Sequence, residues 1–266
     1  IYYNIVLSLV MNALVINLKR SKDRMSYMTH QLDRLNISFE RIDAVDANDL
    51  ETSLYEKHAY DWDRVLRRSE VGCFLSHKRA WEHVMKVGEP FMIFEDDVIL
   101  SKRIVYAVNQ IEKNQKYNFI NLETSSRKKF IHKKKVIITK EYSLSKLLHN
   151  KSGAAAYILW PKFARYLLSN YEKKGAALAD AALYDNHFAL IQHQLIPAVA
   201  IQIQECTYFE IEPPFDHYSN IATQNKPKQK NTIRFKLRRL NTQLKRIIMN
   251  LFHLFYGESK KVNYDS

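Results

Sequence analysis

The stretch Pro90-Phe-Met-Ile-Phe-Glu-Asp-Asp-Val-Ile99 constrains the fold most, because three consecutive carboxylates interrupt an apolar run. Phe91–Phe94 is too short and too continuously apolar for an amphipathic helix, so it predicts a buried strand of a mostly parallel sheet. Ionised carboxylates at the end of such a strand are unfavourable unless a cation compensates them. Oxygen ligands of this kind suit Mg²⁺ or Mn²⁺, and such a metal can neutralise a diphosphate leaving group. A solvated acidic turn is the alternative interpretation.

The elements around this stretch follow the order of an α/β protein. Ala13–Leu18 and Ile37–Ile42 have the composition of strands, and Met25–Leu35 between them has helical spacing of apolar residues. This order opens a doubly wound sheet. Residues 43–69 predict a polar loop with a short helix. Further helices are expected over 70–87, 104–115, 161–171 and 180–191, and further strands over 119–122, 136–139, 153–160 and 199–204.

Two polar segments follow predicted strands, where α/β sheets bind their ligands. Asn17–Arg24 follows the first strand, and Glu95–Asp97 follows the acidic one. Arg20 and Arg24 suit phosphate binding because a guanidinium contacts phosphate in a bidentate manner. The chain holds five glycines and has neither a P-loop nor a dinucleotide-binding fingerprint. That absence argues against kinases, GTPases and dehydrogenases.

Four blocks occur in this order along the chain: Val15-Ile-Asn-Leu-Lys-Arg-Ser-Lys-Asp-Arg24, Glu70-Val-Gly-Cys-Phe-Leu-Ser-His-Lys-Arg-Ala-Trp81, Phe94-Glu-Asp-Asp-Val98 and Gly153-Ala-Ala-Ala-Tyr157. Together they resemble the signature of glycosyltransferase family 25. The resemblance extends over about residues 12–205 and implies a GT-A-like, Rossmann-type sheet flanked by helices. It also implies a UDP-sugar donor and a Mn²⁺ ion, with Mg²⁺ as the alternative.

The resemblance assigns roles to individual side chains. Asp97 and Glu95 would bind the metal, although Glu95 or Asp96 could instead contact the ribose or the sugar. His77 is alternatively a core or capping residue, and Lys78 a solvated one. The residues that would bind the donor and its nucleotide are Asn17, Arg20, Arg24, Ser76, His77, Lys78, Glu95, Asp96 and Gly153.

Asp180 is the first candidate for the general base of the reaction. It stands where the family usually carries a Pro-hydrophobic-Asp block, but positions 178–179 are Leu-Ala here. Asp180 could equally be the N-cap of the helix that it opens. Asp185 and His187 are the further candidates.

The reaction implied is inverting transfer of galactose from UDP-galactose to a lipooligosaccharide or lipopolysaccharide core acceptor, with a β-1,4 linkage expected. UDP-glucose or a UDP-N-acetylhexosamine is the alternative donor. A nucleotidyltransferase would also use carboxylates and Mg²⁺ on an α/β sheet. An alternative of another class is a noncatalytic family member that binds anionic lipid or RNA.

The net charge of +13 is unevenly placed, because residues 226–266 hold eleven Lys/Arg and two Asp/Glu. Apolar residues recur at three- and four-residue spacing from Leu237 to Phe255, with basic residues between them. This is the pattern of a basic amphipathic helix at an anionic membrane surface. A final helix packed on the domain is the alternative, and nucleic acid is a poorer fit because the aromatics lie on the apolar face.

The first ten residues and the two cysteines indicate in which cellular compartment the protein is expected. Residues 1–10 precede Met11 and make a poor signal peptide, so we expect them to be a non-native or upstream leader. Residues 11–225 would then form the transferase domain. Cys73 and Cys206 do not make a disulfide framework. These features predict a cytoplasmic protein, peripherally bound to the inner face of the cytoplasmic membrane.

Overall fold

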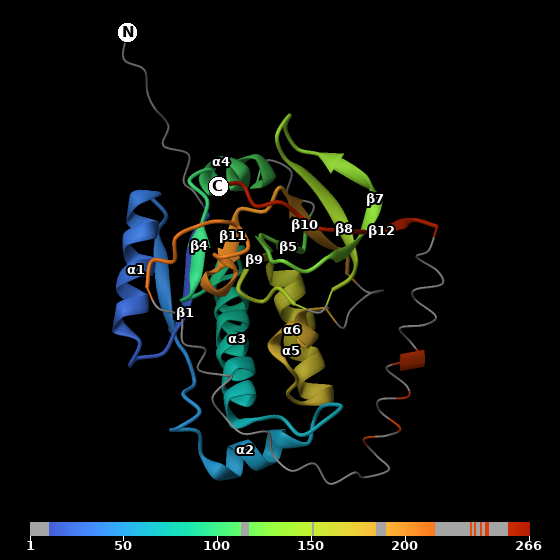
Figure 1. Ribbon diagram of the computed structural model, residues 1–266. Coiled ribbons are helices and arrows are strands. Elements are labelled where there is room, and N and C mark those ends of the chain that lie inside the picture. The colour runs from blue at the N-terminus through green and yellow to red at the C-terminus, as the bar shows by residue number, and fades with distance from the viewer. Residues whose placement is uncertain are drawn as a thin grey trace.

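The computed structural model describes residues 11–112, 117–150, 152–184, 190–215 and 255–266, with residues 235, 237, 240, 243 and 244. Strands and helices alternate through the first half, and strands dominate the second (Figure 1). The helices are α1 (Lys22–Arg34), α2 (Thr52–Ala59), α3 (Arg68–Val87), α4 (Ile104–Glu112), α5 (Pro161–Lys174) and α6 (Ala179–Tyr184). The strands are β1 (Ala13–Asn17), β2 (Phe39–Asp43), β3 (Phe91–Glu95), β4 (Val98–Leu100), β5 (Phe119–Asn121), β6 (Glu123–Thr124), β7 (Lys129–Ile137), β8 (Ser143–His149), β9 (Ala156–Leu159), β10 (Gln192–Ile196), β11 (Ala200–Gln202) and β12 (Gly257–Lys260).

Nine of these strands form one sheet in the order β12-β7-β8-β10-β5-β9-β3-β1-β2. β1 lies between β2 and β3 and is parallel to both. The chain therefore reverses its direction of winding at β1, which leaves a crevice at the carboxyl ends of β1 and β3. The predicted α/β class, with helices flanking the sheet, is confirmed.

The expectation of a mostly parallel sheet is wrong. β9 pairs antiparallel with β3 on one side and with β5 on the other, and β7, β8 and β12 add further antiparallel pairs. The apolar character that suggested parallel strands arises because helices cover both faces of the sheet, whichever way its strands run. The reversed direction of β9 places its first residues beside the last residues of β3, since Ala156 pairs with Phe94.

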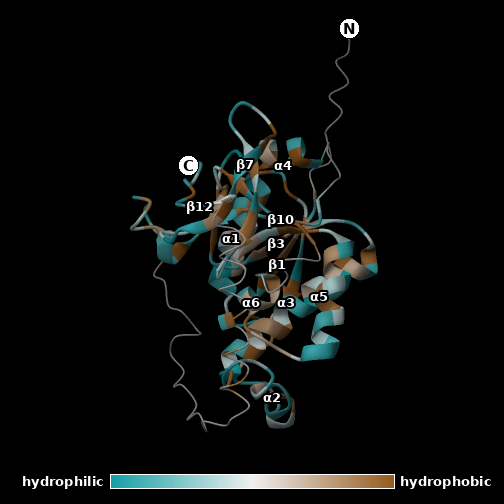
Figure 2. Cartoon of the chain, turned by 90° about the vertical axis from the view of Figure 1, so that its right-hand side faces the viewer, coloured by the Kyte–Doolittle hydropathy of each residue, from teal (hydrophilic) through white to brown (hydrophobic). Residues whose placement is uncertain are grey.

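Alternate residues of the central strands enter two separate cores. Ala13 and Val15 face the side covered by α1 and α4, whereas Leu14 and Ile16 face the side covered by α3, α5 and α6. Strand residues alternate between the faces of a sheet, so a continuously apolar strand is needed wherever both faces are buried. Figure 2 shows the brown, apolar residues gathered on the central strands β1, β3 and β10.

Residues next to α3 explain where this helix begins and ends. α3 carries several of the predicted site residues. The backbone N–H of Arg67 donates to the Glu70 carboxylate at 2.8 Å, and Arg64 clamps that carboxylate through both terminal nitrogens. Such a bond satisfies an N–H group that the helix itself leaves unpaired. Gly88 ends the helix with φ of 82°, a left-handed conformation that glycine adopts without strain.

A second, three-stranded sheet holds the polar edge of the site. Its order is β4-β11-β6, and the Ile203 N–H donates to the Asp97 carbonyl at 2.9 Å. β11 thus brings the side chain of Gln202 to the carboxylates that follow β3.

The end of the chain returns to the large sheet. β12 pairs antiparallel with β7, and Thr124 Oγ1 donates to the Val262 carbonyl at 2.7 Å. The predicted tail of residues 226–266 therefore includes a strand at its end. Of its expected helix, Phe235, Leu237, Leu240, Gln243 and Leu244 are described, and these five are helical.

Several further predictions differ from the structure. The predicted helix 180–191 is described as far as Tyr184, and a strand begins at Gln192. The strand predicted over 136–139 begins earlier, because β7 extends over Lys129–Ile137, and its Lys129 is buried. Residues 1–10 lie outside the described residues. None of the described helices has the length and apolar character needed to cross a membrane.

Candidate functional site

A cavity of about 620 Å³ opens at the carboxyl ends of β1 and β3. Its walls come from segments far apart in sequence: the loops after β1 and β3, one side of α3, the start of α6 and the residues before β9. The predicted site residues that line it are Arg20, Arg24, Ser76, His77, Glu95, Asp96, Asp97, Gly153 and Asp180.

Asp96 is held by residues of the first block. Asn17 Nδ2 donates to Asp96 Oδ2 at 2.7 Å, and Arg24 Nη1 donates to Oδ1 at 3.2 Å. Burial raises the pKa of Asp96, while Arg24 and Asn17 act in the opposite direction. Both oxygens of Asp96 therefore accept hydrogen bonds, one from the end of β1 and the other from the first turn of α1.

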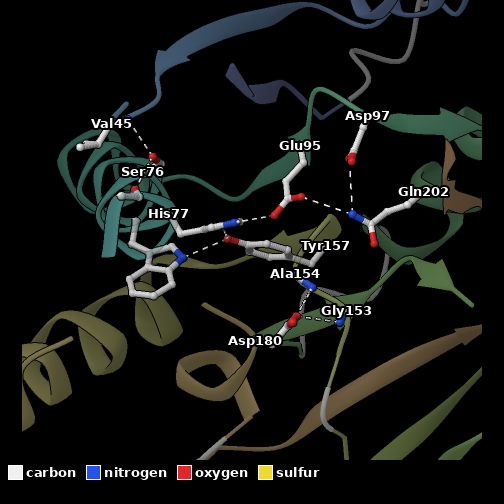
Figure 3. Close-up of polar contacts among 12 residues, drawn as sticks. Val45, Ser76, His77, Glu95, Asp97, Gly153, Ala154, Tyr157, Asp180 and Gln202 are labelled. Carbon is white, nitrogen blue, oxygen red and sulfur yellow. Dashed lines mark hydrogen bonds and ion pairs between the residues drawn. The ribbon is translucent and has the colours of Figure 1, made fainter. Parts of the chain in front are cut away.

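Glu95 points toward His77 across the cavity floor (Figure 3). His77 Nε2 lies 3.1 Å from Glu95 Oε1, and His77 Nδ1 lies 3.0 Å from the Tyr157 hydroxyl. That hydroxyl also accepts the indole N–H of Trp81 at 3.0 Å. The histidine, which is fully buried, is thus fixed from both ring nitrogens and orients Glu95.

Asp97 is a buried carboxylate without a guanidinium or ammonium partner among the described residues. Gln202 Nε2 lies 3.4 Å from both Asp97 Oδ1 and Glu95 Oε2, so one amide group spans the two carboxylates. Burial, together with the negative charges of Glu95 and Asp96, raises the pKa of Asp97 to about 7. The site therefore concentrates negative charge that its own cations do not neutralise.

This charge imbalance fits a bound divalent cation. Glu95 and Asp97 offer the hard oxygen ligands that Mn²⁺ and Mg²⁺ prefer, and a cation between them would offset both the burial of Asp97 and the neighbouring negative charge, which together raise its pKa. Asp96 is a poorer candidate because Asn17 and Arg24 already occupy its oxygens. The predicted ligand pair thus agrees with the chemistry of the site.

Asp180 lies at the opposite wall, in the first turn of α6. Its Oδ1 accepts the backbone N–H groups of Gly153 and Ala154, each at 2.9 Å. The carboxylate therefore anchors the loop before β9, and no described hydrogen bond has it capping its own helix. Burial, followed by the charge of Glu95, raises the pKa of Asp180 to about 6. A carboxylate of that pKa is ionised at neutral pH and can accept a proton.

Gly153 is enclosed by protein side chains. Its φ is 123°, and a Cβ atom there would lie 2.5 Å from Asn121 Nδ2 and 3.0 Å from Glu123 Oε1. Glycine is thus required both by its backbone conformation and by the polar groups packed against it. Gly153, which the resemblance places among the donor-binding residues, is therefore in close contact with Asn121 and Glu123.

The remaining predicted residues have mixed placements. Ser76 Oγ donates to the Gly72 carbonyl at 2.7 Å and accepts the Val45 N–H at 2.8 Å, so it holds the loop after β2. Arg20 pairs with Asp46 at 2.5 Å on the exposed rim. Lys78 pairs with Glu82 at 2.5 Å and does not line the cavity, and its ammonium lies 5.1 Å from the centre of the Tyr171 ring. Asp185 and His187 lie outside the described residues.

Glu123 is a site residue that the sequence analysis missed. It lines the cavity from the carboxyl end of β5, and its Oε2 is buried without a hydrogen-bond partner among the described groups. Nearby, the buried ammonium of Lys129 donates to Asn121 Oδ1, the Glu123 carbonyl and Gln194 Oε1 at 2.6–3.0 Å. Burial raises the pKa of Glu123 and lowers that of Lys129 to about 8. The sequence signal that could have identified Glu123 is its position directly after the strand predicted over 119–122.

Comparison with known proteins identifies relatives of one kind. Residues 11–183 match the model of the family described as Glycosyltransferase family 25 (LPS biosynthesis protein). The chain is 26% identical over 172 residues to the lacto-N-neotetraose biosynthesis glycosyltransferase LgtE of Neisseria gonorrhoeae, covering 59% of each chain. Two human proteins match over a shorter region. Procollagen galactosyltransferase 2 is 37% identical over 95 residues, and inactive glycosyltransferase 25 family member 3 is 38% identical over 94.

The matched regions differ in extent. Each human match covers 32% of this chain, but only 15% and 16% of those proteins. Among solved structures, a glycosyltransferase involved in glycosylation of the PBCV-1 major capsid aligns with 10% identity and a TM-score of 0.41, over 73% of this chain and 92% of that one.

Proposed function

The chain belongs to glycosyltransferase family 25, and from this premise we propose that it transfers galactose from UDP-galactose to a lipooligosaccharide or lipopolysaccharide core acceptor. The family description and the name of the Neisseria relative support an acceptor of this class. The name of the human procollagen galactosyltransferase supports galactose. The single observation that carries the proposal is that Glu95 and Asp97 face a cavity that also holds Asp180, and that Asp97 has no guanidinium or ammonium partner among the described residues.

The donor would lie with its diphosphate toward the carboxyl ends of β1 and β3. Arg20 and Arg24 line that part of the cavity, and each is already paired with a carboxylate that orients it. Glu95 and Asp97 would hold Mn²⁺, or Mg²⁺ as the alternative. When bound, the metal supplies positive charge that stabilises the departing diphosphate.

Asp180 would act as the general base. The acceptor hydroxyl would transfer its proton to the Asp180 carboxylate while its oxygen forms a bond to the anomeric carbon. The bond from that carbon to the diphosphate oxygen breaks at the same time, and UDP leaves with the electron pair. Attack from the side opposite UDP inverts the anomeric configuration, which gives a β linkage from an α-linked donor.

The proposal extends to a membrane surface. The exposed fractions of Leu237, Leu240 and Leu244 are 61%, 53% and 50%, so these apolar side chains are not covered by the domain. The basic residues between them in sequence suit anionic headgroups. A membrane-anchored acceptor would be presented at that surface.

The test is release of UDP from a panel of UDP-sugars, with Mn²⁺ or with EDTA, in the presence of a lipooligosaccharide acceptor. We expect release from UDP-galactose, loss of release with EDTA, and a fall of about 100-fold or more in the Asp97→Asn variant. Asp33→Asn, which removes an exposed carboxylate from α1, is the matched control and should leave the rate unchanged. Release from UDP-glucose or a UDP-N-acetylhexosamine instead would reassign the donor.

The second candidate function is a noncatalytic one, which the inactive human relative favours. It predicts no UDP binding in the presence of Mn²⁺, together with salt-sensitive binding of an anionic lipid or RNA. Release of pyrophosphate from a sugar 1-phosphate and UTP would instead indicate a nucleotidyltransferase.

A further inference from the structure

One wall of the cavity brings together three metal-binding atoms of a different chemistry from the Glu95–Asp97 pair. Cys73 and His77 are one helical turn apart on α3, so their side chains project from the same face. Glu95 reaches them from the end of β3. The Cys73 sulfur, a His77 ring nitrogen and a Glu95 carboxylate oxygen all lie within 4.8 Å of one another.

We propose that Cys73, His77 and Glu95 form a binding site for a zinc-like transition metal, and that such an ion inhibits this protein. A thiolate, an imidazole and one carboxylate form a ligand set typical of Zn²⁺ and Co²⁺, whereas Mg²⁺ and Mn²⁺ favour oxygen ligands. Ligands of one tetrahedral zinc ion lie roughly 3.3–3.8 Å apart, given metal–ligand bonds of about 2.0–2.3 Å. Small side-chain rotations would bring the three atoms to that spacing.

The surroundings of His77 support metal binding through Nε2. That nitrogen already faces Glu95 Oε1 at 3.1 Å, and Nδ1 is 3.0 Å from the Tyr157 hydroxyl. With a metal on Nε2, Nδ1 carries the hydrogen and donates it to the Tyr157 oxygen. Such a bond fixes the ring and strengthens the ligand, as in many metal sites.

The position of these side chains in the cavity determines how an ion reaches them and what its binding changes. Cys73, His77 and Glu95 all line it, so an ion can enter from solvent and keep a coordination position open toward the cavity. Binding would release the thiol proton of Cys73 and would occupy Glu95. Since Glu95 is also a proposed ligand of the Mn²⁺ used with the donor, the two metals would compete.

Cobalt spectroscopy tests the site independently of any transferase activity. Adding one equivalent of Co²⁺ to the purified chain near neutral pH should produce a near-ultraviolet thiolate-to-cobalt charge-transfer band and intense visible bands. The charge-transfer band should disappear in Cys73→Ser and persist in Cys206→Ser, which changes a buried cysteine that does not line the cavity. Zn²⁺ should displace Co²⁺, and Mn²⁺ should not.

Two results would overturn the proposal: no charge-transfer band in the wild type, or a band that survives in Cys73→Ser. Should Cys73→Ser fail to fold by circular dichroism, wild-type protein still decides the question. Zn²⁺ should slow alkylation of Cys73 by iodoacetamide, as followed by mass spectrometry, and an unchanged rate would refute the site. Where UDP release is measurable, equimolar Zn²⁺ should suppress it in the wild type and in Cys206→Ser, with less effect on Cys73→Ser.

Discussion

Neighbouring carboxylates of the acidic triplet have different surroundings, and those surroundings determine what each can do. Asp96 is paired with Asn17 and Arg24, whereas the amide of Gln202 is the one side-chain partner of Asp97 among the described residues. A paired carboxylate joins two strands, and an unpaired one retains oxygens for an external cation. Residue type and spacing alone do not separate the two roles.

Asp180 has two functions that can be separated by mutation. Asp180→Asn keeps an oxygen that can accept the N–H groups of Gly153 and Ala154, but it removes the proton-accepting carboxylate. We expect its melting temperature to stay close to that of the wild type, while transfer falls by about 10²–10⁴-fold. Asp180→Ala should in addition lower the free energy of unfolding by about 1–3 kcal/mol, because two backbone donors lose their partner. Thermal denaturation and UDP release measure both effects, and an active Asp180→Asn would exclude Asp180 as the base.

At the scale of single elements, the direction of β9 is decisive. Its antiparallel insertion between β3 and β5 carries Gly153 and Ala154 to the carboxyl ends of those strands, where Asp180 holds them. A parallel strand at the same position would have placed these residues at the far end of the sheet. The composition of β9 does not encode its direction, because a strand buried on both faces is apolar either way.

The packing of α3 against the loop after β2 depends on Gly72. A Cβ atom at this position would lie 2.7 Å from the Val45 carbonyl oxygen, a backbone atom that cannot rotate away. We expect Gly72→Ala to lower the free energy of unfolding by about 1–3 kcal/mol, as overpacking does. Alanine favours a helix over glycine by about 1 kcal/mol, which acts in the opposite direction. Urea denaturation measures the net effect, and a more stable Gly72→Ala variant would show that the contact with Val45 relaxes without cost.

β10 carries a buried histidine that makes stability depend on pH. Burial, aided by the charge of Lys146 on the paired strand β8, lowers the pKa of His193 to about 4. The unfolded chain, with a pKa near 6.5, therefore binds a proton that the folded chain excludes. The stability present above pH 6.5 is lost as pH falls toward 4, by on the order of 3 kcal/mol.

The variant His193→Phe tests this pH dependence, because it keeps an aromatic ring beside Tyr117, whose ring centre lies 5.0 Å away in the wild type. Urea denaturation between pH 4 and pH 6.5 should show the wild type losing stability relative to this variant as the pH falls. Lys146→Met removes the neighbouring charge, which should raise the pKa of His193 and make the loss of stability smaller. Equal slopes in wild type and His193→Phe would contradict the assignment.

At the scale of the whole molecule, the two ends of the final segment behave differently. Val262 is buried, and residues 263–265 bond to Ala198 beside β11, so the last residues belong to the domain. Phe235 packs with Ala59 and Val65 near α2, while Leu237, Leu240 and Leu244 are exposed. Contacts with the domain are thus described at Phe235 and at residues 257–265, whereas the three leucines between them are exposed.

Membrane binding should depend on charge in this segment. Replacing Arg238, Arg239, Lys245 and Arg246 by glutamine should weaken binding to phosphatidylserine vesicles by about 1 kcal/mol per charge in co-sedimentation. A matched control removes the four charges of Lys128, Lys133, Lys134 and Lys135, which lie at exposed or partly exposed positions in or beside β7, and should have a smaller effect. Equal loss in both variants would indicate attraction by overall charge, and RNA that displaces the vesicles would favour the nucleic-acid alternative.

The sequence determined the α/β class, the position of most helices and four of the carboxylates that line the cavity, Glu95, Asp96, Asp97 and Asp180. These features depend on residues close together in sequence. The periodicity of apolar residues indicates helices and buried strands, and a carboxylate beside a buried strand requires a cation or a hydrogen-bond partner. The Asp96 pairing, the Glu123 and Gln202 contacts and the meeting of Cys73, His77 and Glu95 were decided by the tertiary structure alone. Each depends on which strands become neighbours and in which direction they run, and that choice is made by the packing of the whole sheet between its two helical layers.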